Sequence, residues 1–356
     1  MSHQQLTTFP HDPLLDLEPW VGQRQCTYRF ERINGVTGEV LGEIHPLRGA
    51  TLTHDTTRTI KRQLSFSLGV VDSALVEALT DRILLFMVFP NGAEYPLGRY
   101  IFTDQSQELF TSGRLANMVL NDEMFLVDQQ ITTGVGSSNR NVVTVVQEVL
   151  EPLPVSFDME PSPFASNSSW SIGTGRGALL EDLATQGDYF SPWFDNEGVM
   201  RWIRSFDPAD GRLPDFDFDA HRNVLRAGIT ETSDLLTAPN KFIVISNAPN
   251  NTSTEVVGIA DIPSNAPHSF ASRGFEIASV QDLQVLDAGQ AQAVARNLAN
   301  RQTVFERTTL STPPDPRHDS YNVIRWQGAL WLELAWSMAL VEGGAMGHLL
   351  RKAYSP

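Results

Sequence analysis

Short runs of alternating apolar and polar residues dominate the first third of the chain. The stretch 50–68 predicts a half-buried strand, and its alternation is clearest over residues 62–68, where a period of two sends successive side chains to opposite faces. Asn91-Gly92 lies between the apolar runs 82–90 and 94–103, and this dipeptide between apolar runs is a strong β-hairpin signal. These patterns predict one antiparallel sheet or barrel.

The middle of the chain changes to a helical pattern. Residues 141–150 carry apolar side chains at helical spacing, and the polar residues at 137–139 precede them as candidate N-terminal caps. A second helix is predicted over residues 178–186, with Gly187 at its C-terminal end. A hairpin follows, so residues 131–224 are expected to form an inserted α+β module.

The last third returns to strand-like patterns. Compact apolar runs predict strands over residues 241–246, 303–310, 323–326 and 330–340. An Ala-rich amphipathic segment predicts one helix near residues 288–301. We therefore expect a second β-barrel-like domain over residues 225–356.

The predicted fold class is α+β and mainly β, with two antiparallel β-barrel-like domains around the α+β module. The first barrel-like domain covers residues 20–130 and follows an N-terminal arm over residues 1–19. The 356 residues, 41% of them hydrophobic, suffice for the cores of two or three domains. No basic segment followed by an apolar one opens the chain, and no run of about 18 uncharged apolar residues occurs. The sequence thus predicts neither secretion nor a membrane-spanning segment.

The formal net charge of −16 restricts the expected partners. Affinity for DNA phosphates comes from clustered Lys and Arg, and the sequence shows no such cluster. We therefore do not expect the chain to wrap around the outside of DNA, although DNA could slide past a surface of like charge without binding. Cys26 is the only cysteine, which excludes an internal disulfide and a cysteine-rich metal site.

Two kinds of motif invite a reactive-site interpretation. Glycines at 173–177 precede the second predicted helix, and a helix N-terminus attracts anions, but their spacing fits neither a phosphate loop nor a dinucleotide site. A flexible start to the helix is therefore favoured. The nearest approach to a metal or acid–base pair comes from two dipeptides, His54-Asp55 and His318-Asp319. Because adjacent strand residues point to opposite faces, both are expected to be solvated or to cap turns.

Three aspartates are a further candidate for a binding site. Asp215, Asp217 and Asp219 alternate with phenylalanines and predict one acidic strand face. They lack the loop pattern of a calcium site, so a solvated face is favoured over a cation site.

Three of the seven tryptophans, Trp326, Trp331 and Trp336, could form a sugar-binding platform. Because Trp331 and Trp336 are an odd number of residues apart, they would face opposite sides of a regular strand. Packing in a core or a subunit interface is therefore favoured. No catalytic, cofactor-binding or metal-binding residues are predicted, and no cofactor is expected.

The order of these features resembles the tail-tip or baseplate hub proteins of long-tailed bacteriophages, and most of all minor tail proteins of phages that infect actinobacteria. Six segments carry the resemblance: 49–68, 95–104, 179–202, 239–246, 289–302 and 343–354. The resemblance implies a hub ring that continues the tail tube and connects it to the host-recognition and penetration apparatus, with DNA passing through the lumen. The family supplies no catalytic residues, so it implies a structural protein of the virion and not an enzyme.

The resemblance also implies partners and a location. These partners are two further copies in a homotrimer, tail tube and distal tail proteins above, tip or fibre proteins below, and the tape measure protein in the lumen. DNA would pass transiently, without specific binding, through a channel whose lining the net charge predicts to be partly acidic. The protein is expected in the tail tip of the virion after synthesis in the cytoplasm of the host bacterium.

Two alternatives stay open at this point. A distal tail or peripheral baseplate protein would share the β-rich pattern, and a distal ring would contain six copies where a hub contains three. A carbohydrate-binding or carbohydrate-cleaving tail module would use the Trp and Asp residues. Binding to host cell-wall glycans separates that class from the structural one.

Overall fold

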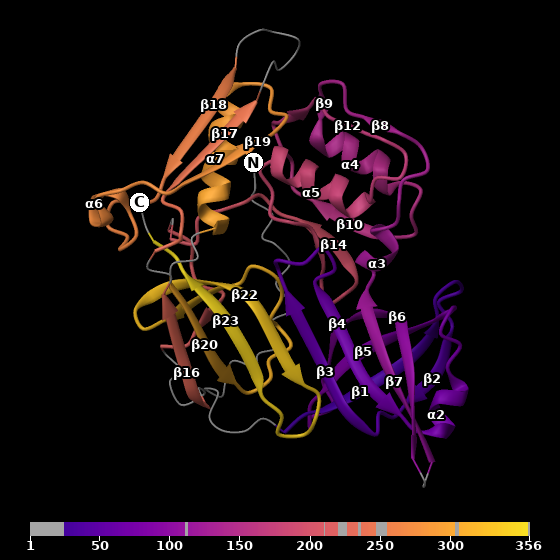
Figure 1. Ribbon diagram of the computed structural model, residues 1–356. Coiled ribbons are helices and arrows are strands. Elements are labelled where there is room, and N and C mark those ends of the chain that lie inside the picture. Colours follow the sequence, from indigo (N-terminus) through magenta and orange to yellow (C-terminus); the bar gives the residue numbers. More distant parts are fainter. Residues whose placement is uncertain are drawn as a thin grey trace.

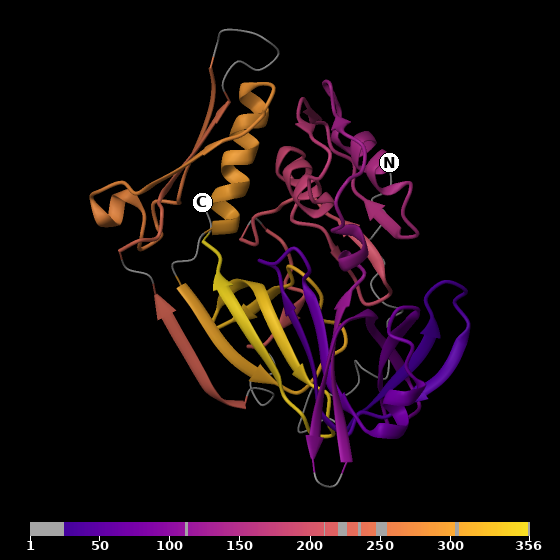
Figure 2. The ribbon, with the colours of Figure 1, turned by 45° about the vertical axis from the view of Figure 1, so that its right-hand side comes forward.

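The computed structural model describes residues 25–110, 113–209, 211–219, 226–233, 236–246, 255–302 and 306–354. In this part of the chain strands predominate, which confirms the mainly β fold class (Figure 1). One large sheet fills one end of the molecule, and two smaller α/β units lie side by side at the other end. Figure 2 shows the same separation after rotation.

The N-terminal strands form the predicted hairpins. The elements are β1 (Thr27–Asn34), β2 (Val40–Ile44), β3 (Arg48–Asp55), β4 (Arg62–Leu68), α2 (Val70–Leu75), β5 (Asp81–Val88), β6 (Glu94–Phe110) and β7 (Gly113–Asp122). Strands β5 and β6 pair antiparallel on either side of Asn91-Gly92. Gly92 has a φ of 84°, a left-handed conformation that glycine adopts without steric cost.

The stretch 50–68, interpreted above as one strand, forms the antiparallel pair β3 and β4 with a turn between them. The carboxylate of Asp55 accepts a hydrogen bond from the amide of Thr57 at 2.9 Å, as short polar side chains do in turns. The polar run after Asp55 was therefore a turn signal.

The inserted module has its two main helices where the sequence predicts them. Its elements are α3 (Met124–Val127), β8 (Val135–Gly136), β9 (Arg140–Asn141), α4 (Val142–Leu150), β10 (Ser156–Met159), β11 (Ala165–Ser166), β12 (Ser169–Trp170), α5 (Arg176–Gln186), β13 (Trp193–Phe194) and β14 (Val199–Trp202). Gly187 is the C-cap of α5, as predicted. The cap of α4 differs from the prediction, because Asn141 accepts a hydrogen bond from the Val143 amide at 2.8 Å, whereas Ser138 and Asn139 lie outside the helix with positive φ.

The C-terminal region supplies strands to two different sheets. Its elements are β15 (Phe216–Asp217), β16 (Arg226–Ser233), β17 (Lys241–Ser246), β18 (Val256–Asp261), α6 (Phe270–Arg273), β19 (Ala278–Asp282), α7 (Ala288–Gln302), β20 (Glu306–Thr312), β21 (Val323–Trp326), β22 (Ala329–Ala339) and β23 (Met346–Lys352). Strands β18, β17 and β19 form a small sheet of their own, and α7 packs against one of its faces through a shared apolar core.

The main sheet contains 13 strands in the order β16-β20-β23-β22-β3-β4-β7-β6-β5-β1-β2, with β21 and β15 attached beside β22. Strand β22 pairs with β3 along five residue pairs, from Ala335 opposite Asp55 to Ala339 opposite Thr51. The described strands therefore form an open sheet shared by both β regions, where two barrel-like domains were predicted. The two β regions do not close separately, because β22 of one region pairs with β3 of the other. Among the described residues, no helix is long and apolar enough to cross a membrane.

Candidate functional site

A row of uncharged residues, polar apart from one glycine, crosses the middle of the main sheet. Each member lies directly opposite the next on the neighbouring strand, and the row reads Ser311, Gly347, Ser337, Thr53, Gln63 and Asn121. Paired residues of antiparallel strands project to the same face. We call this row and the sheet surface around it the polar face.

Hydrogen bonds between side chains connect neighbouring strands on the polar face. The Gln63 amide donates to Asn121 at 3.3 Å, and the Asn121 amide donates to Thr103 at 3.1 Å. Ser67 donates to Asn117 at 2.7 Å. The side chains of the row are uncharged hydroxyls and amides, so the row presents hydrogen-bonding atoms without charge.

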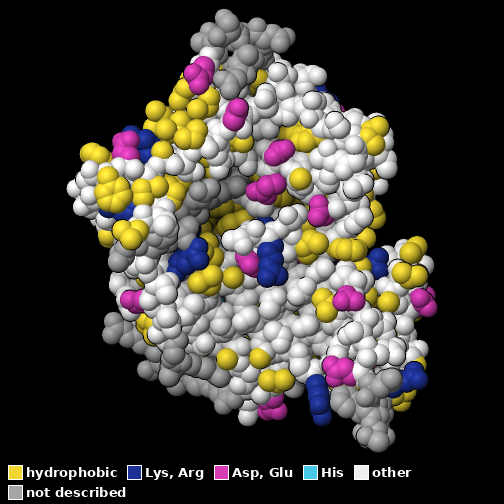
Figure 3. All heavy atoms as spheres, viewed as in Figure 1, with side chains coloured by type: hydrophobic (Ala, Val, Ile, Leu, Met, Phe, Trp, Pro, Cys, Tyr) yellow, Lys and Arg dark blue, Asp and Glu magenta, His cyan; other side chains and the backbone are white. Residues whose placement is uncertain are grey.

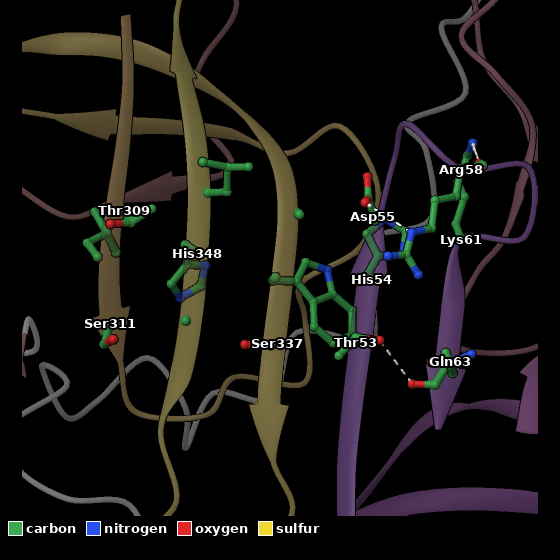
Figure 4. A pocket seen from close by; sticks show the side chains of 15 residues that line it. Thr53, His54, Asp55, Arg58, Lys61, Gln63, Thr309, Ser311, Ser337 and His348 are labelled. Carbon is green, nitrogen blue, oxygen red and sulfur yellow. Dashed lines mark hydrogen bonds and ion pairs between the residues drawn. The ribbon is translucent and has the colours of Figure 1, made fainter. Parts of the chain in front are cut away.

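The polar face is hollowed over strands β20, β23, β22, β3 and β4 (Figure 4). The hollow has a volume of about 530 Å³, and charged side chains reach it only at one end. There Asp55 and Arg58 form an ion pair at 3.3 Å. Over β22, β3 and β4 the surface is largely free of charged side chains (Figure 3).

The opposite face of the same strands is buried. Next to the row, Leu52, Leu64 and Leu120 are fully buried in an apolar core together with Trp336. The two faces therefore differ completely in character, because the strands alternate polar and apolar residues.

A buried arginine joins the three parts of the chain beneath this sheet. Arg62, on β4, donates to Asn196 of the inserted module at 2.6 Å and pairs with Asp319 at 2.5 Å. Its backbone amide donates to the carboxylate of Asp122 at 3.1 Å. Burial raises the pKa of Asp122 to about 6, against the opposite effect of Arg62. The network therefore fixes the relative positions of β4, the module and the segment that precedes β21.

His54 lies beside this network. Its ring stacks on Trp336 with centroids 5.3 Å apart, and its Nε2 atom lies 2.8 Å from the hydroxyl of Ser320. Burial lowers the pKa of His54 well below its ordinary value, and the positive charges of Arg62 and Lys61 lower it further. His54 is therefore neutral at pH 7.

Three further ionisable side chains converge in the C-terminal part of the sheet. Glu333 accepts one hydrogen bond at each carboxylate oxygen, from Nδ1 of His318 at 2.8 Å and from Nδ1 of His348 at 2.6 Å. All three side chains are buried. Nε2 of His348 lies 2.8 Å from the Thr312 hydroxyl. We call these three residues the His–Glu–His cluster.

Aromatic rings enclose the His–Glu–His cluster. Phe216 stacks on His318 with centroids 3.9 Å apart and nearly parallel planes, and the Phe218 ring lies 5.7 Å from His348. Burial would raise the pKa of Glu333, but the two histidines outweigh it and hold this pKa below its ordinary value. Burial lowers the pKa of His348.

The two His-Asp dipeptides split between environments, as alternation along a strand predicts. His54 points into the core whereas Asp55 borders the polar face. His318 belongs to the His–Glu–His cluster, and Asp319 pairs with Arg62. Neither dipeptide brings both of its side chains to one point.

The glycine motif at 173–177 leads into helix α5, whose first turn is already occupied. The Asp128 carboxylate accepts a hydrogen bond from the Gly177 amide at 3.1 Å. A Cβ atom at Gly177 would lie 2.3 Å from that carboxylate. Glycine is therefore required here for close approach of Asp128, and a protein carboxylate takes the place that an anion would fill.

The side chains of the three aspartates near β15 make hydrogen bonds and an ion pair with other residues of the chain. Asp215 accepts from the Val323 amide at 2.7 Å, and Asp217 pairs with Arg325 at 3.2 Å. Asp219 accepts from two consecutive amides that follow β21, at 2.8 and 2.7 Å. These contacts attach β15 and the residues around it to β21.

Trp326, Trp331 and Trp336 are buried, in agreement with core packing, but the prediction that Trp331 and Trp336 face opposite sides is wrong. Trp331 lies opposite Lys352 and Trp336 opposite His348, and residues four apart on β23 share a face. Trp331 and Trp336 therefore face the same side. The register shift between Glu333 and Ala335 is a bulge that inserts one residue and reverses the alternation.

Solved structures share this architecture. A tail protein from Neisseria meningitidis MC58 superposes with a TM-score of 0.61 over 92% of this chain and 96% of its own, at 13% identity. A 43 kDa tail protein of prophage MuSo2 from Shewanella oneidensis gives 0.60 over 91% and 98%, at 11% identity. The chain has the fold of prophage tail proteins. The resemblance found in the order of sequence features is thus confirmed for the fold.

The same architecture occurs within a larger protein. A chain of a Francisella PdpA–VgrG complex superposes with a TM-score of 0.51 over 96% of this chain and 60% of its own, at 11% identity. No family model matches the sequence, and neither does any curated protein. The tail-protein fold is therefore visible in the structure at a level of sequence identity that hides it.

Sequence reasoning missed the His–Glu–His cluster. His318 was paired with its neighbour Asp319, whereas its partners lie on β22 and β23. One signal could have found them: Glu333 is the single charged residue within the apolar run 330–336, and a buried carboxylate requires partners.

Proposed function

We propose that the chain is a structural subunit of a phage tail tip, forming a hub ring that continues the tail tube, with the polar face lining the channel for DNA. The observation that carries this proposal is the uncharged row across six strands, in a chain with the fold of tail proteins. The chain performs no catalysis in this role and acts through its surfaces.

An uncharged polar lining suits a channel that DNA must pass without delay. Lys and Arg would retain phosphates through counterion release, and the row from Ser311 to Asn121 offers neither. A channel lined by this face would differ from the partly acidic lining that the net charge predicts, because its strands carry hydroxyl and amide side chains. Weak hydrogen bonding without charge leaves no strong site where DNA would stop.

Exposed apolar surfaces support assembly into a homotrimer. On the outer face of the small sheet, Ile243 lies opposite both Ile259 and Val280, and Ile245 lies opposite Val257. Ile259 and Val280 are 46% and 57% exposed, and hydrophobic side chains gather over β18 and α6 in Figure 3. Among the strands that the structure describes, β2 lies at the end of the main sheet and is largely exposed. Contacts between copies would cover these surfaces.

The remaining partners follow from this position in the tail. Tail tube or distal tail proteins would contact the ring from above, tip or fibre proteins from below, and the tape measure protein would occupy the lumen before DNA passes. The subunit would be part of the virion after synthesis in the host cytoplasm, and actinobacteria remain the expected hosts.

An experiment that introduces positive charge tests the channel lining. Phage particles carrying Thr53→Arg together with Ser337→Arg should assemble but eject DNA at least several-fold more slowly, because two adjacent cations would bind phosphate, and high salt should relieve the defect. Ser264→Arg, at an exposed position away from the row, is the matched control and should eject normally. If the double variant ejects DNA at the normal rate at low salt, the polar face does not line the channel.

A further inference from the structure

The His–Glu–His cluster has the composition of a transition-metal site. Imidazole nitrogen and carboxylate oxygen are the donors that zinc takes together in proteins. One donor atom from each of the three residues lies within 4.8 Å of the others, and all three side chains are buried. Each residue supplies one donor atom, and a second oxygen of Glu333 would complete a distorted four-coordinate site.

The spacing of these atoms is close to what a metal requires. Zinc bonds of ~2.0–2.2 Å in a tetrahedral arrangement hold the donors roughly 3.3 Å from one another. The two nitrogen–oxygen distances are 2.8 and 2.6 Å, so shifts of about 1 Å or less in these side chains would admit an ion. The protons now on the two Nδ1 atoms would be released on binding.

The surroundings hold the histidines as ligands are usually held. Nε2 of His348 lies 2.8 Å from the Thr312 hydroxyl, which fixes the orientation of the ring, and bonds of this kind to the second nitrogen are typical of metal-binding histidines. The parallel Phe216 ring fixes His318 from the other side. The aromatic shell would keep water away from the ion.

A cation also answers the electrostatic requirement of the cluster. Glu333 is a buried carboxylate whose two oxygens accept hydrogen bonds from His318 and His348, and a buried charge without a counter-charge is costly. The cluster joins three segments of the chain. His318 lies in the proline-rich connector that precedes β21, Glu333 lies on β22, and His348 lies on β23. An ion there would pin the connector to the sheet.

We infer that His318, Glu333 and His348 form a structural site for zinc or a similar divalent transition metal, which pins the segment before β21 to strands β22 and β23.

Metal titration of the purified full chain tests this inference. After removal of metals with a chelator, the chain should bind about one Co²⁺ per molecule, with the visible absorption of a four-coordinate site, and Zn²⁺ should displace it. Zn²⁺ should also raise the midpoint of thermal unfolding. Glu333→Gln should abolish the cobalt spectrum, whereas His54→Gln, which removes a buried histidine outside the cluster, should leave it unchanged.

A gentler variant covers the case in which Glu333→Gln fails to fold. Thr312→Val keeps the volume of the side chain, leaves all three cluster residues in place and removes the bonds of the hydroxyl to His348 and to the Pro313 carbonyl. It should weaken metal binding about 10- to 100-fold. A wild-type chain that takes up no Co²⁺ or Zn²⁺ would overturn the inference and leave a proton as the counter-charge of Glu333. Equal uptake by wild type, Glu333→Gln and Thr312→Val would also overturn it, by showing that the metal binds at other side chains.

Discussion

Two regions of the main sheet bury different kinds of side chain. Beneath β3 to β7 the core is made of aliphatic and aromatic residues such as Leu64 and Phe66. Beneath β20 to β23 the buried face also carries polar groups, including Thr312, Glu333 and His348. An apolar core needs only the right alternation and volume, whereas a polar core needs each group to meet a specific partner.

The boundary between these regions depends most on Arg62, and its loss gives the largest expected effect. Arg62→Met should lower the free energy of unfolding by about 3 kcal/mol, because the half-buried Asp319 loses its counter-charge and the buried Asn196 loses a hydrogen-bond donor. Denaturant unfolding measures this effect. Arg58→Met is the control, since Arg58 and its partner Asp55 have side chains 63% and 31% exposed, and the pair should contribute under about 1 kcal/mol. Equal effects of the two variants would contradict the role given to Arg62.

Within the apolar core, the loss of stability on truncating a side chain should depend on the volume removed. Leu64→Ala should lower the free energy of unfolding by about 3 kcal/mol, since a fully buried leucine leaves a cavity. Ser65→Ala tests the opposite face of the same strand and should change it by less than about 0.5 kcal/mol. Comparable losses from the two positions would mean that the faces of β4 are assigned the wrong way round.

The boundary near Arg62 should also be sensitive to acid, through His54 on β3. The folded-state pKa of His54 lies well below its ordinary value, so the unfolded chain binds more protons below pH ~6.5. The neutral His54 therefore stabilises the folded state fully above this pH. As the pH drops below it, the free energy of unfolding falls by up to about 1.4 kcal/mol per pH unit. His54→Gln should flatten the decline between pH 6.5 and 5 in unfolding experiments. An identical decline in the variant would show that other groups cause it.

The inserted module gives a smaller test that distinguishes the observed cap from the predicted one. Asn141→Ala should lower the free energy of unfolding by about 1 kcal/mol, because the Val143 amide loses its acceptor. Ser138→Ala should have less than half of this effect. Thermal unfolding of the two variants decides, and a larger loss at Ser138 would restore the cap inferred from the sequence.

The sequence was sufficient where one local pattern decides the structure. The Asn91-Gly92 turn, the alternation of β4 and the helix ending at Gly187 could be predicted because each depends on a few adjacent residues. The pairing of β22 with β3 could not, because it joins residues nearly 300 positions apart and nothing local marks which edge meets which.

The bulge between Glu333 and Ala335 shows the same limit within a single strand. Counting residues placed Trp331 and Trp336 on opposite faces, and one inserted residue reversed that result. The hydrogen bonds of the buried polar groups also depend on how the strands are finally aligned. Glu333 meets His318 and His348 only after the fold has brought three distant segments together, so its partners could not be read from its neighbours.

The most direct test of the central claim is a three-dimensional reconstruction of the assembled tail tip by electron microscopy. The account predicts three copies of this chain around one axis, with Ser311, Ser337, Thr53 and Asn121 facing the lumen. Six copies, or three copies whose polar face points away from the axis, would contradict it.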